Sequence, residues 1–136
     1  MIHQLIRAVP VLGRILLGSL FVLGGMNKIL TFSETAQRMA DVGLTPAEPL
    51  LVLTISLELI AGSLVVLGAR FAAVAALLLA LFTLATNFYF HRFWEFEGPL
   101  RVLELSLYFK NVSISGGLLV LAGYSLEVHK SGRFQS

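Results

Sequence analysis

Four long apolar stretches, separated by short polar breaks, set the pattern of this chain. The stretches cover residues 9–30, 46–67, 71–90 and 103–124. Each is about 20 residues long, and a helix of that length, rising about 1.5 Å per residue, crosses the roughly 30 Å hydrocarbon core of a bilayer. The pattern predicts an all-α integral membrane protein, a single bundle of four spanning helices.

The polar break after the first span has a helical period of its own. Residues 32–42 are amphipathic, with Ser33 placed to cap the start of a helix and Gly43 placed to end it. We expect a short helix that lies along the membrane surface. Thr45 and Glu48 then have the spacing of a capping box, with Pro46 at the first helical position, which predicts that the second span begins there.

The connections and the basic residues bear on the topology. Residues 68–70 leave room only for a tight turn, so the second and third spans should form an antiparallel hairpin. Four spans place both ends of the chain on one side, and we expect the polar tail, residues 127–136, to be poorly ordered. Lysine and arginine residues in the flanks divide equally between the two sides. Arg7, near the amino terminus, favours a cytoplasmic location for both ends.

Composition agrees with a membrane protein and excludes several kinds of chemistry. Hydrophobic residues make up 57% of the 136 residues and charged residues 13%, and the mean hydropathy is +0.85. The chain has no cysteine, which excludes disulfides and thiol redox relays within it. Its three histidines are too far apart for a recognisable metal motif, and its basic residues are scattered. We therefore expect no metal site and no nucleic-acid partner.

Two charged residues interrupt the apolar spans. Arg14 lies on the same stripe of the first span as Gly18 and Gly25, about 10 Å from the side of the termini, and Glu58 lies about 15 Å from that side in the second span. An unpaired charge at that depth would cost at least a few kcal/mol. We predict an intramembrane ion pair between Arg14 and Glu58, which would either hold the bundle together or relay protons.

A second polar layer lies toward the opposite side of the membrane. Its members end the first and third spans or lie about 10 Å down the fourth, so a bundle can bring them to one mouth. Such a layer would bind an anion, a carbonyl-bearing ligand, or the carboxylates of Glu95 or Glu97. His91 could instead be an ordinary interfacial residue, and Lys28 could extend to the lipid headgroups. The candidate ligand-binding residues are Asn27, Lys28, Asn87, His91, Lys110 and Asn111.

Several of these positions recur in the order of a known family. Gly25 and Lys28 form a Gly-x-x-Lys motif after Gly13-Arg14, and Lys110-Asn111 precede Gly116-Gly117. Over about residues 10–124 the chain resembles the DoxX family of small bacterial four-helix membrane proteins. The resemblance implies an inner-membrane location and a likeness to a subunit of a thiosulfate:quinone oxidoreductase. The polar positions that match the family are Arg14, Lys28, Glu58, His91, Lys110 and Asn111.

Three functional hypotheses follow. In the first, the chain is a subunit of a membrane redox complex whose polar mouth binds a quinone. Lys28, His91 and Lys110 would donate hydrogen bonds to the quinone carbonyls, and His91 is the candidate catalytic residue because it can supply a proton near neutral pH. No flavin, haem or iron-sulfur motif is visible, so the electron donor would be a protein partner and the chain alone would be inactive.

In the second hypothesis the protein has no turnover. The same mouth would hold a lipid or small anion, or the bundle would assemble with a partner's helix or with a second copy. The third hypothesis is a proton-coupled carrier that uses Glu58, which would have to dimerise to form a path.

Overall fold

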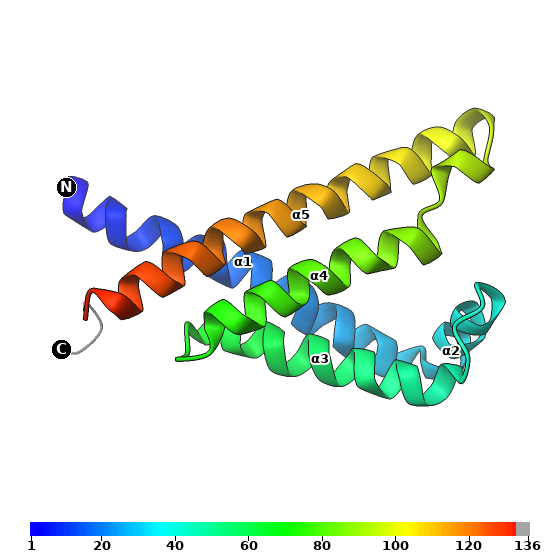
Figure 1. Ribbon diagram of the computed structural model, residues 1–136, viewed down its shortest axis with the longest axis horizontal. Coiled ribbons are helices and arrows are strands. Elements are labelled where there is room, and N and C mark those ends of the chain that lie inside the picture. Colours follow the sequence, from blue (N-terminus) through cyan, green and yellow to red (C-terminus); the bar gives the residue numbers. More distant parts are fainter. Residues whose placement is uncertain (133–136) are drawn as a thin grey trace.

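The computed structural model describes residues 1–132 as a bundle of helices (Figure 1). Four helices are long and apolar enough to cross a membrane, which confirms the predicted all-α architecture. A shorter helix, α2, follows the first span, and a single 3-10 turn, η1, precedes the last. The elements are α1 (Ile2–Leu30), α2 (Phe32–Asp41), α3 (Ala47–Leu67), α4 (Ala72–Phe90), η1 (Phe93–Glu95) and α5 (Gly98–Lys130).

The long helices pack in the order α1, α3, α4, α5. α1 packs chiefly on α3, and α5 packs chiefly on α4, while α1 and α5 touch only over a short stretch where they cross (Figure 1). Leu79 and Leu118 are fully buried in the centre. At the α1–α3 seam a Cβ on Gly18 would lie only 2.7 Å from the carbonyl oxygen of Gly62, so these glycines allow a close approach of the two backbones.

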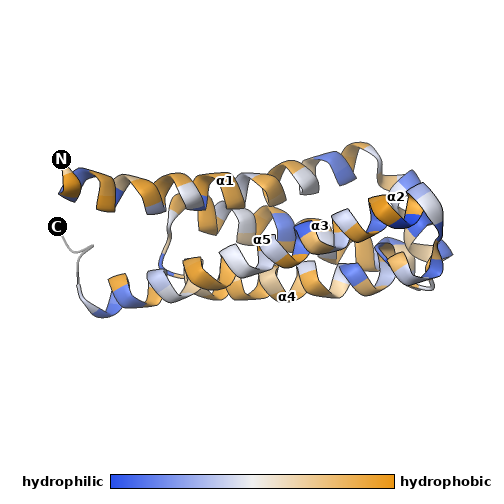
Figure 2. Ribbon diagram, turned by 90° about the horizontal axis from the view of Figure 1, so that it is seen from above, coloured by the Kyte–Doolittle hydropathy of each residue, from blue (hydrophilic) through white to orange (hydrophobic). Residues whose placement is uncertain are grey.

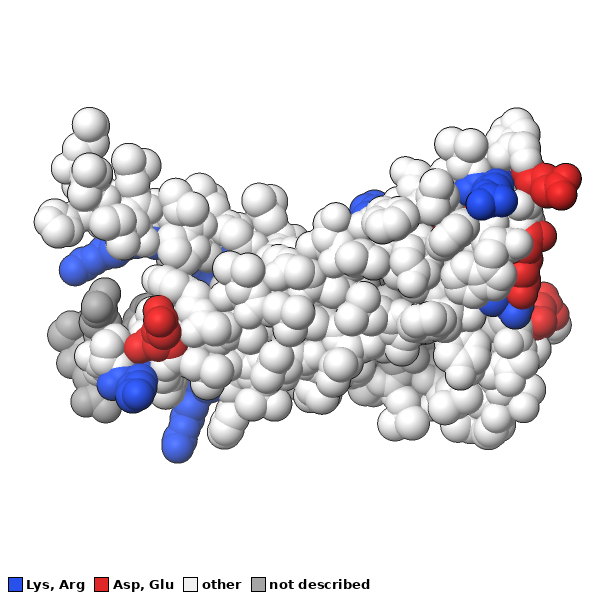
Figure 3. Space-filling model, turned by 45° about the horizontal axis from the view of Figure 1, so that its top comes forward, with Lys and Arg blue, Asp and Glu red and all other residues white. Residues whose placement is uncertain are grey.

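The outer surface of the bundle is apolar along its middle. Large hydrophobic side chains such as Leu16, Leu53, Leu81 and Val120 are exposed on the four long helices. Figure 2 shows hydrophobic residues along the length of each span, and on the face in Figure 3 most charged side chains gather toward the two ends. Because an apolar surface of this extent is unfavourable in water, the bundle requires a lipid bilayer around it.

Two spans are longer than the hydropathy pattern predicts. α1 begins at Ile2 instead of near residue 9, and α5 continues to Lys130, through part of the predicted polar tail. The remainder of that tail, residues 133–136, lies outside the described residues. The difference has a simple cause. Hydropathy marks only the part of a helix that suits hydrocarbon, whereas backbone hydrogen bonding can continue the same helix beyond it.

The ends of the shorter elements also differ in detail. α2 is present as predicted, but Thr31 is its N-cap in place of Ser33. α3 begins after Pro46, and no side chain caps it, so the predicted capping box does not form. Gly68 has the left-handed backbone (φ 64°) that ends α3 and allows the tight turn into α4. The buried Met39 packs α2 against the α3 residue Leu51, which fixes α2 across one end of the bundle.

Candidate functional site

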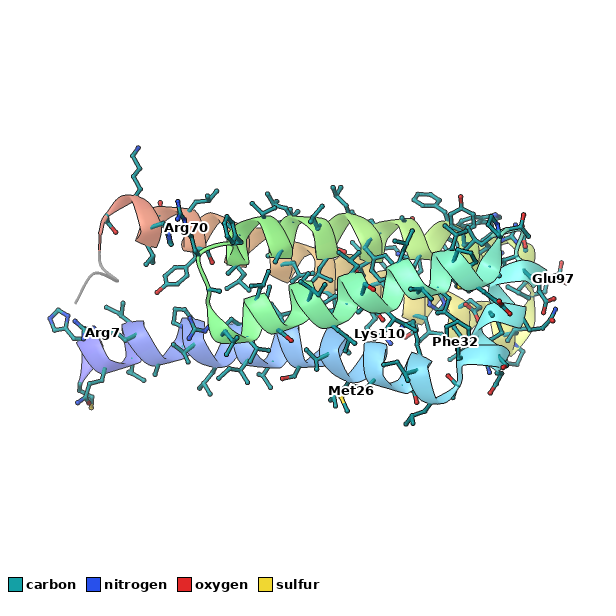
Figure 4. The ribbon with its side chains drawn as sticks, turned by 90° about the horizontal axis from the view of Figure 1, so that it is seen from below. Arg7, Met26, Phe32, Arg70, Glu97 and Lys110 are labelled. Atoms are coloured by element: carbon teal, nitrogen blue, oxygen red, sulfur yellow. The ribbon has the colours of Figure 1, made fainter. Side chains whose placement is uncertain are left out.

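A polar pocket of about 530 Å³ opens at the end of the bundle that α2 covers. It lies among α1, α2, α3, α4 and α5. Figure 4 shows Lys110 between the helices, toward that end of the bundle. Five of the six residues predicted to bind a ligand line it, and the sixth, Asn87, is buried directly behind it. The five lining residues are Asn27, Lys28, His91, Lys110 and Asn111.

An ion pair between Lys28 and Glu58 forms the floor where α1 meets α3. The Lys28 Nζ lies 2.9 Å from each carboxylate oxygen of Glu58 and donates a hydrogen bond to Oε1. The other oxygen, Oε2, is buried and accepts no hydrogen bond from residues 1–132. Side chains on a helix lean toward its amino terminus, so Lys28 reaches back over Gly24 to Glu58. The ammonium of Lys28 therefore neutralises the Glu58 carboxylate at the floor of the pocket.

The predicted ion pair between Arg14 and Glu58 is wrong, because Glu58 pairs with Lys28. The antiparallel register that sets Gly18 against Gly62 also sets the guanidinium of Arg14 against Gly68, at the turn between α3 and α4. Gly68 is ten residues after Glu58, which is about 15 Å along a helix. The prediction counted both depths from one common level, but α1 extends past the turn that follows α3, so Arg14 lies beside that turn and not beside Glu58.

A hydrogen-bonded amide pair joins α4 to α5 behind the pocket. The Asn111 Nδ2 donates to the Asn87 Oδ1 at 2.9 Å, and the Asn87 Nδ2 donates to the carbonyl of Tyr108 at 3.1 Å. Asn87 is only 1% exposed, so its polar atoms are committed to protein. It is a positioning residue that holds Asn111 at the pocket wall, where sequence reasoning had grouped both with the ligand-binding residues.

The imidazole of His91 is held by a carboxylate that the sequence analysis did not single out. Its Nδ1 lies 2.9 Å from Oε2 of Glu104, on the second turn of α5. An ionised carboxylate only accepts, so Nδ1–H donates and Nε2 is left for another contact. The acids expected there do not reach the layer. Glu95 pairs with Arg92 at 3.0 Å, and Glu97 precedes the first residue of α5 without making a side-chain capping hydrogen bond.

The rim of the pocket comes from α2. Glu34 and Arg38 line it and form an ion pair with each other, one turn apart on the helix. Hydropathy gave no sign of this contribution, because it depends on how α2 folds back over the bundle. Among the ion pairs of residues 1–132, none includes Lys110, so its ammonium is the one lining charge in that range without a carboxylate partner.

The arrangement defines a class of protein: a small multi-pass membrane bundle with a polar pocket at the end of its spans. The chain belongs to the DoxX family, whose profile matches residues 9–92. It is similar to the inner membrane protein YphA of Escherichia coli K12, at 32% identity over 82% of this chain and 79% of the relative. It is also similar to the inner membrane protein YqjF of the same organism, at 38% identity over 80% of this chain and 78% of the relative. No solved structure matches it.

Proposed function

We propose that this protein binds the headgroup of a quinone in the polar pocket, as the membrane subunit of a redox complex whose electron donor is a partner protein. One observation carries the proposal. Lys110 presents an ammonium without a carboxylate partner among residues 1–132, in a pocket whose other lining charges are paired. An unpaired cation beside apolar walls favours a neutral or anionic ligand that accepts hydrogen bonds.

The size and the walls of the pocket fit a substituted ring. Its volume of about 530 Å³ falls within the roughly 300–1,000 Å³ typical of small-molecule sites. Phe21, Phe82, Phe90 and Ile114 supply apolar surface for the faces of a ring. Polar groups come from the same helices, with Lys28 on α1 and Lys110 on α5, so one pocket offers both apolar surface and hydrogen-bonding groups to a ligand.

Quinone chemistry needs groups that donate hydrogen bonds to the oxidised ligand and groups that accept hydrogen bonds from the reduced ligand. A bound quinone would supply two-electron redox chemistry. Lys110 would donate to a carbonyl oxygen and stabilise negative charge on it. His91, held by Glu104 through Nδ1, would present Nε2 to a hydroxyl group of the reduced ligand. In this proposal the electrons come from the partner protein, and this chain acts as an accessory subunit that binds the quinone.

A Lys110→Met variant tests the proposal. We expect purified parent protein to retain an added short-chain quinone in native mass spectrometry, and the variant to bind it at least about tenfold more weakly, because a charge-assisted hydrogen bond is lost. Lys130→Met removes a lysine from the far end of α5 and should bind like the parent. Equal retention by Lys110→Met and the parent would contradict the proposal.

The alternative function is non-catalytic holding of a lipid or small anion, or assembly with another membrane protein. One observation favours an assembly role: α1 is the least buried of the four spans, so most of its surface is available to a partner helix or a second copy. If Lys110→Met binds the quinone as tightly as the parent does, and the protein forms a stable complex with a partner, this alternative is favoured.

A further inference from the structure

A second pocket, of about 730 Å³, lies at the opposite end of the bundle from the polar pocket. It is bounded by the first half of α1, the turn between α3 and α4, and the last turns of α5. Figure 4 shows Arg7 and Arg70 at this end, on separate elements. α1 and α5 extend past the turn and diverge there (Figure 1), so the pocket lies between their ends.

The polar lining of this pocket is basic. Three arginines from two elements contribute, Arg7, Arg14 and Arg70, and two histidines, His3 and His129, lie beside them. No aspartate or glutamate within the described part of the chain lines it. The ion pairs of residues 1–132 likewise include none of the three arginines. The pocket therefore gathers positive charge that the described protein does not neutralise.

Arg14 adds an independent sign that a ligand belongs there. Its Nε is buried and has no hydrogen-bond partner among residues 1–132. A buried polar group without a partner costs about 1–3 kcal/mol, and more when it is charged. The guanidinium lies against Gly68 and lines the pocket, so an acceptor bound in the pocket is within reach of the group.

The remaining lining is apolar. Ile6, Val11, Leu121 and Val128 form the walls between the basic groups. A free inorganic anion gains nothing from such walls, whereas an amphiphile can place its acyl chains on them and its charge on the arginines. Guanidinium groups match phosphate oxygens through two parallel hydrogen bonds.

We propose that this terminal pocket binds the phosphate group of an anionic phospholipid, with Arg7, Arg14 and Arg70 on the phosphate and the apolar walls against the acyl chains. The site is separate from the quinone pocket and does not depend on the function proposed for it. If both ends of the chain are cytoplasmic, as the sequence predicts, the lipid comes from the cytoplasmic leaflet.

The test compares an anionic and a zwitterionic phospholipid with the same acyl chains. Detergent-purified full-length protein is titrated with phosphatidylglycerol and with phosphatidylcholine of the same acyl chains, and bound lipid is counted by native mass spectrometry. We expect phosphatidylglycerol to be retained at about tenfold lower concentration. Inorganic phosphate, added alone, should neither be retained nor raise the unfolding temperature. If it does both as strongly as phosphatidylglycerol does, the site takes free phosphate and the lipid proposal fails.

Variants locate the site. Arg70→Gln and Arg7→Gln change exposed side chains that no core packing requires, and each should weaken phosphatidylglycerol binding about tenfold. Arg101→Gln, an exposed arginine at the start of α5, is the matched control and should have no effect. Lys110→Met should lose quinone and keep phosphatidylglycerol, and Arg70→Gln should do the reverse. If Arg7→Gln and Arg70→Gln both bind the two lipids like the parent, the proposal is overturned.

Discussion

At the scale of single residues, two ion pairs join charges on different helices, and two further charges that form no ion pair within residues 1–132 line the candidate sites. Lys28 and Glu58 neutralise each other between α1 and α3, and His91 meets Glu104 between the end of α4 and α5. In hydrocarbon an unpaired charge is costly, so pairing is the expected arrangement. Lys110 at one end and Arg14 at the other depart from it, and each lines a pocket.

The Lys28–Glu58 pair predicts an asymmetric response to mutation. The side chain of Glu58 is 6% exposed and that of Lys28 is 27% exposed, so an unpaired lysine can turn toward water while an unpaired glutamate cannot. Lys28→Met should cost about 3–5 kcal/mol of unfolding free energy, Glu58→Gln should cost less, and the double variant should recover part of the loss.

Unfolding in a detergent titration, followed by circular dichroism, measures these differences. Arg14→Leu combined with Glu58→Gln is the control cycle. Since Arg14 lies against Gly68 and not against Glu58, the two changes should add without coupling. If the coupling energy between Arg14 and Glu58 is larger than the coupling energy between Lys28 and Glu58, the pair predicted from the sequence is correct and the structure is contradicted.

At the scale of elements, the α1–α3 seam determines which polar groups meet. Gly18 and Gly62 bring the two helices together in one register, and that register places Lys28 beside Glu58 and Arg14 beside the α3–α4 turn. α2 then folds back across the end of the bundle and supplies the rim of the polar pocket. The seam is therefore the feature on which the geometry of both pockets depends.

Two alanine substitutions on α1 should have opposite effects. A Cβ on Gly18 would lie 2.6 Å from a methyl group of Val66 and 2.7 Å from the backbone oxygen of Gly62, so Gly18→Ala forces the helices apart. We expect it to cost about 1–3 kcal/mol. A Cβ on Gly13 would have no neighbour within 4 Å, so Gly13→Ala should be neutral or stabilise the helix by up to about 1 kcal/mol.

Thermal unfolding of both variants in the same detergent compares them directly. Gly18→Ala should unfold at a lower temperature than the parent, and Gly13→Ala at the same temperature or higher. If the two variants unfold alike, the close contact between α1 and α3 is not formed in the protein.

At the scale of the whole molecule, hydropathy was sufficient to predict the four spans, the amphipathic α2 and the tight turn at Gly68. It also placed Asn27, His91 and Lys110 in one layer, because residues at equal depth in a small bundle lie close together. The side chains with which the buried charges pair were not predictable in the same way. The contacts of Glu58 and Glu104 depend on helix register and rotation, and the hydrophobic pattern of one chain does not specify these. The basic terminal pocket escaped prediction because α1 and α5 were expected to be shorter.

The central claim is that the polar pocket holds a quinone, and one measurement tests it most directly. The full-length protein and its Lys110→Met variant would be extracted gently from their own membrane, and the small molecules that they retain would be identified by native mass spectrometry. We predict a quinone on the parent protein and a several-fold smaller amount on the variant, with phospholipid retained by both. A parent protein that carries phospholipid and no quinone would contradict the account of the polar pocket.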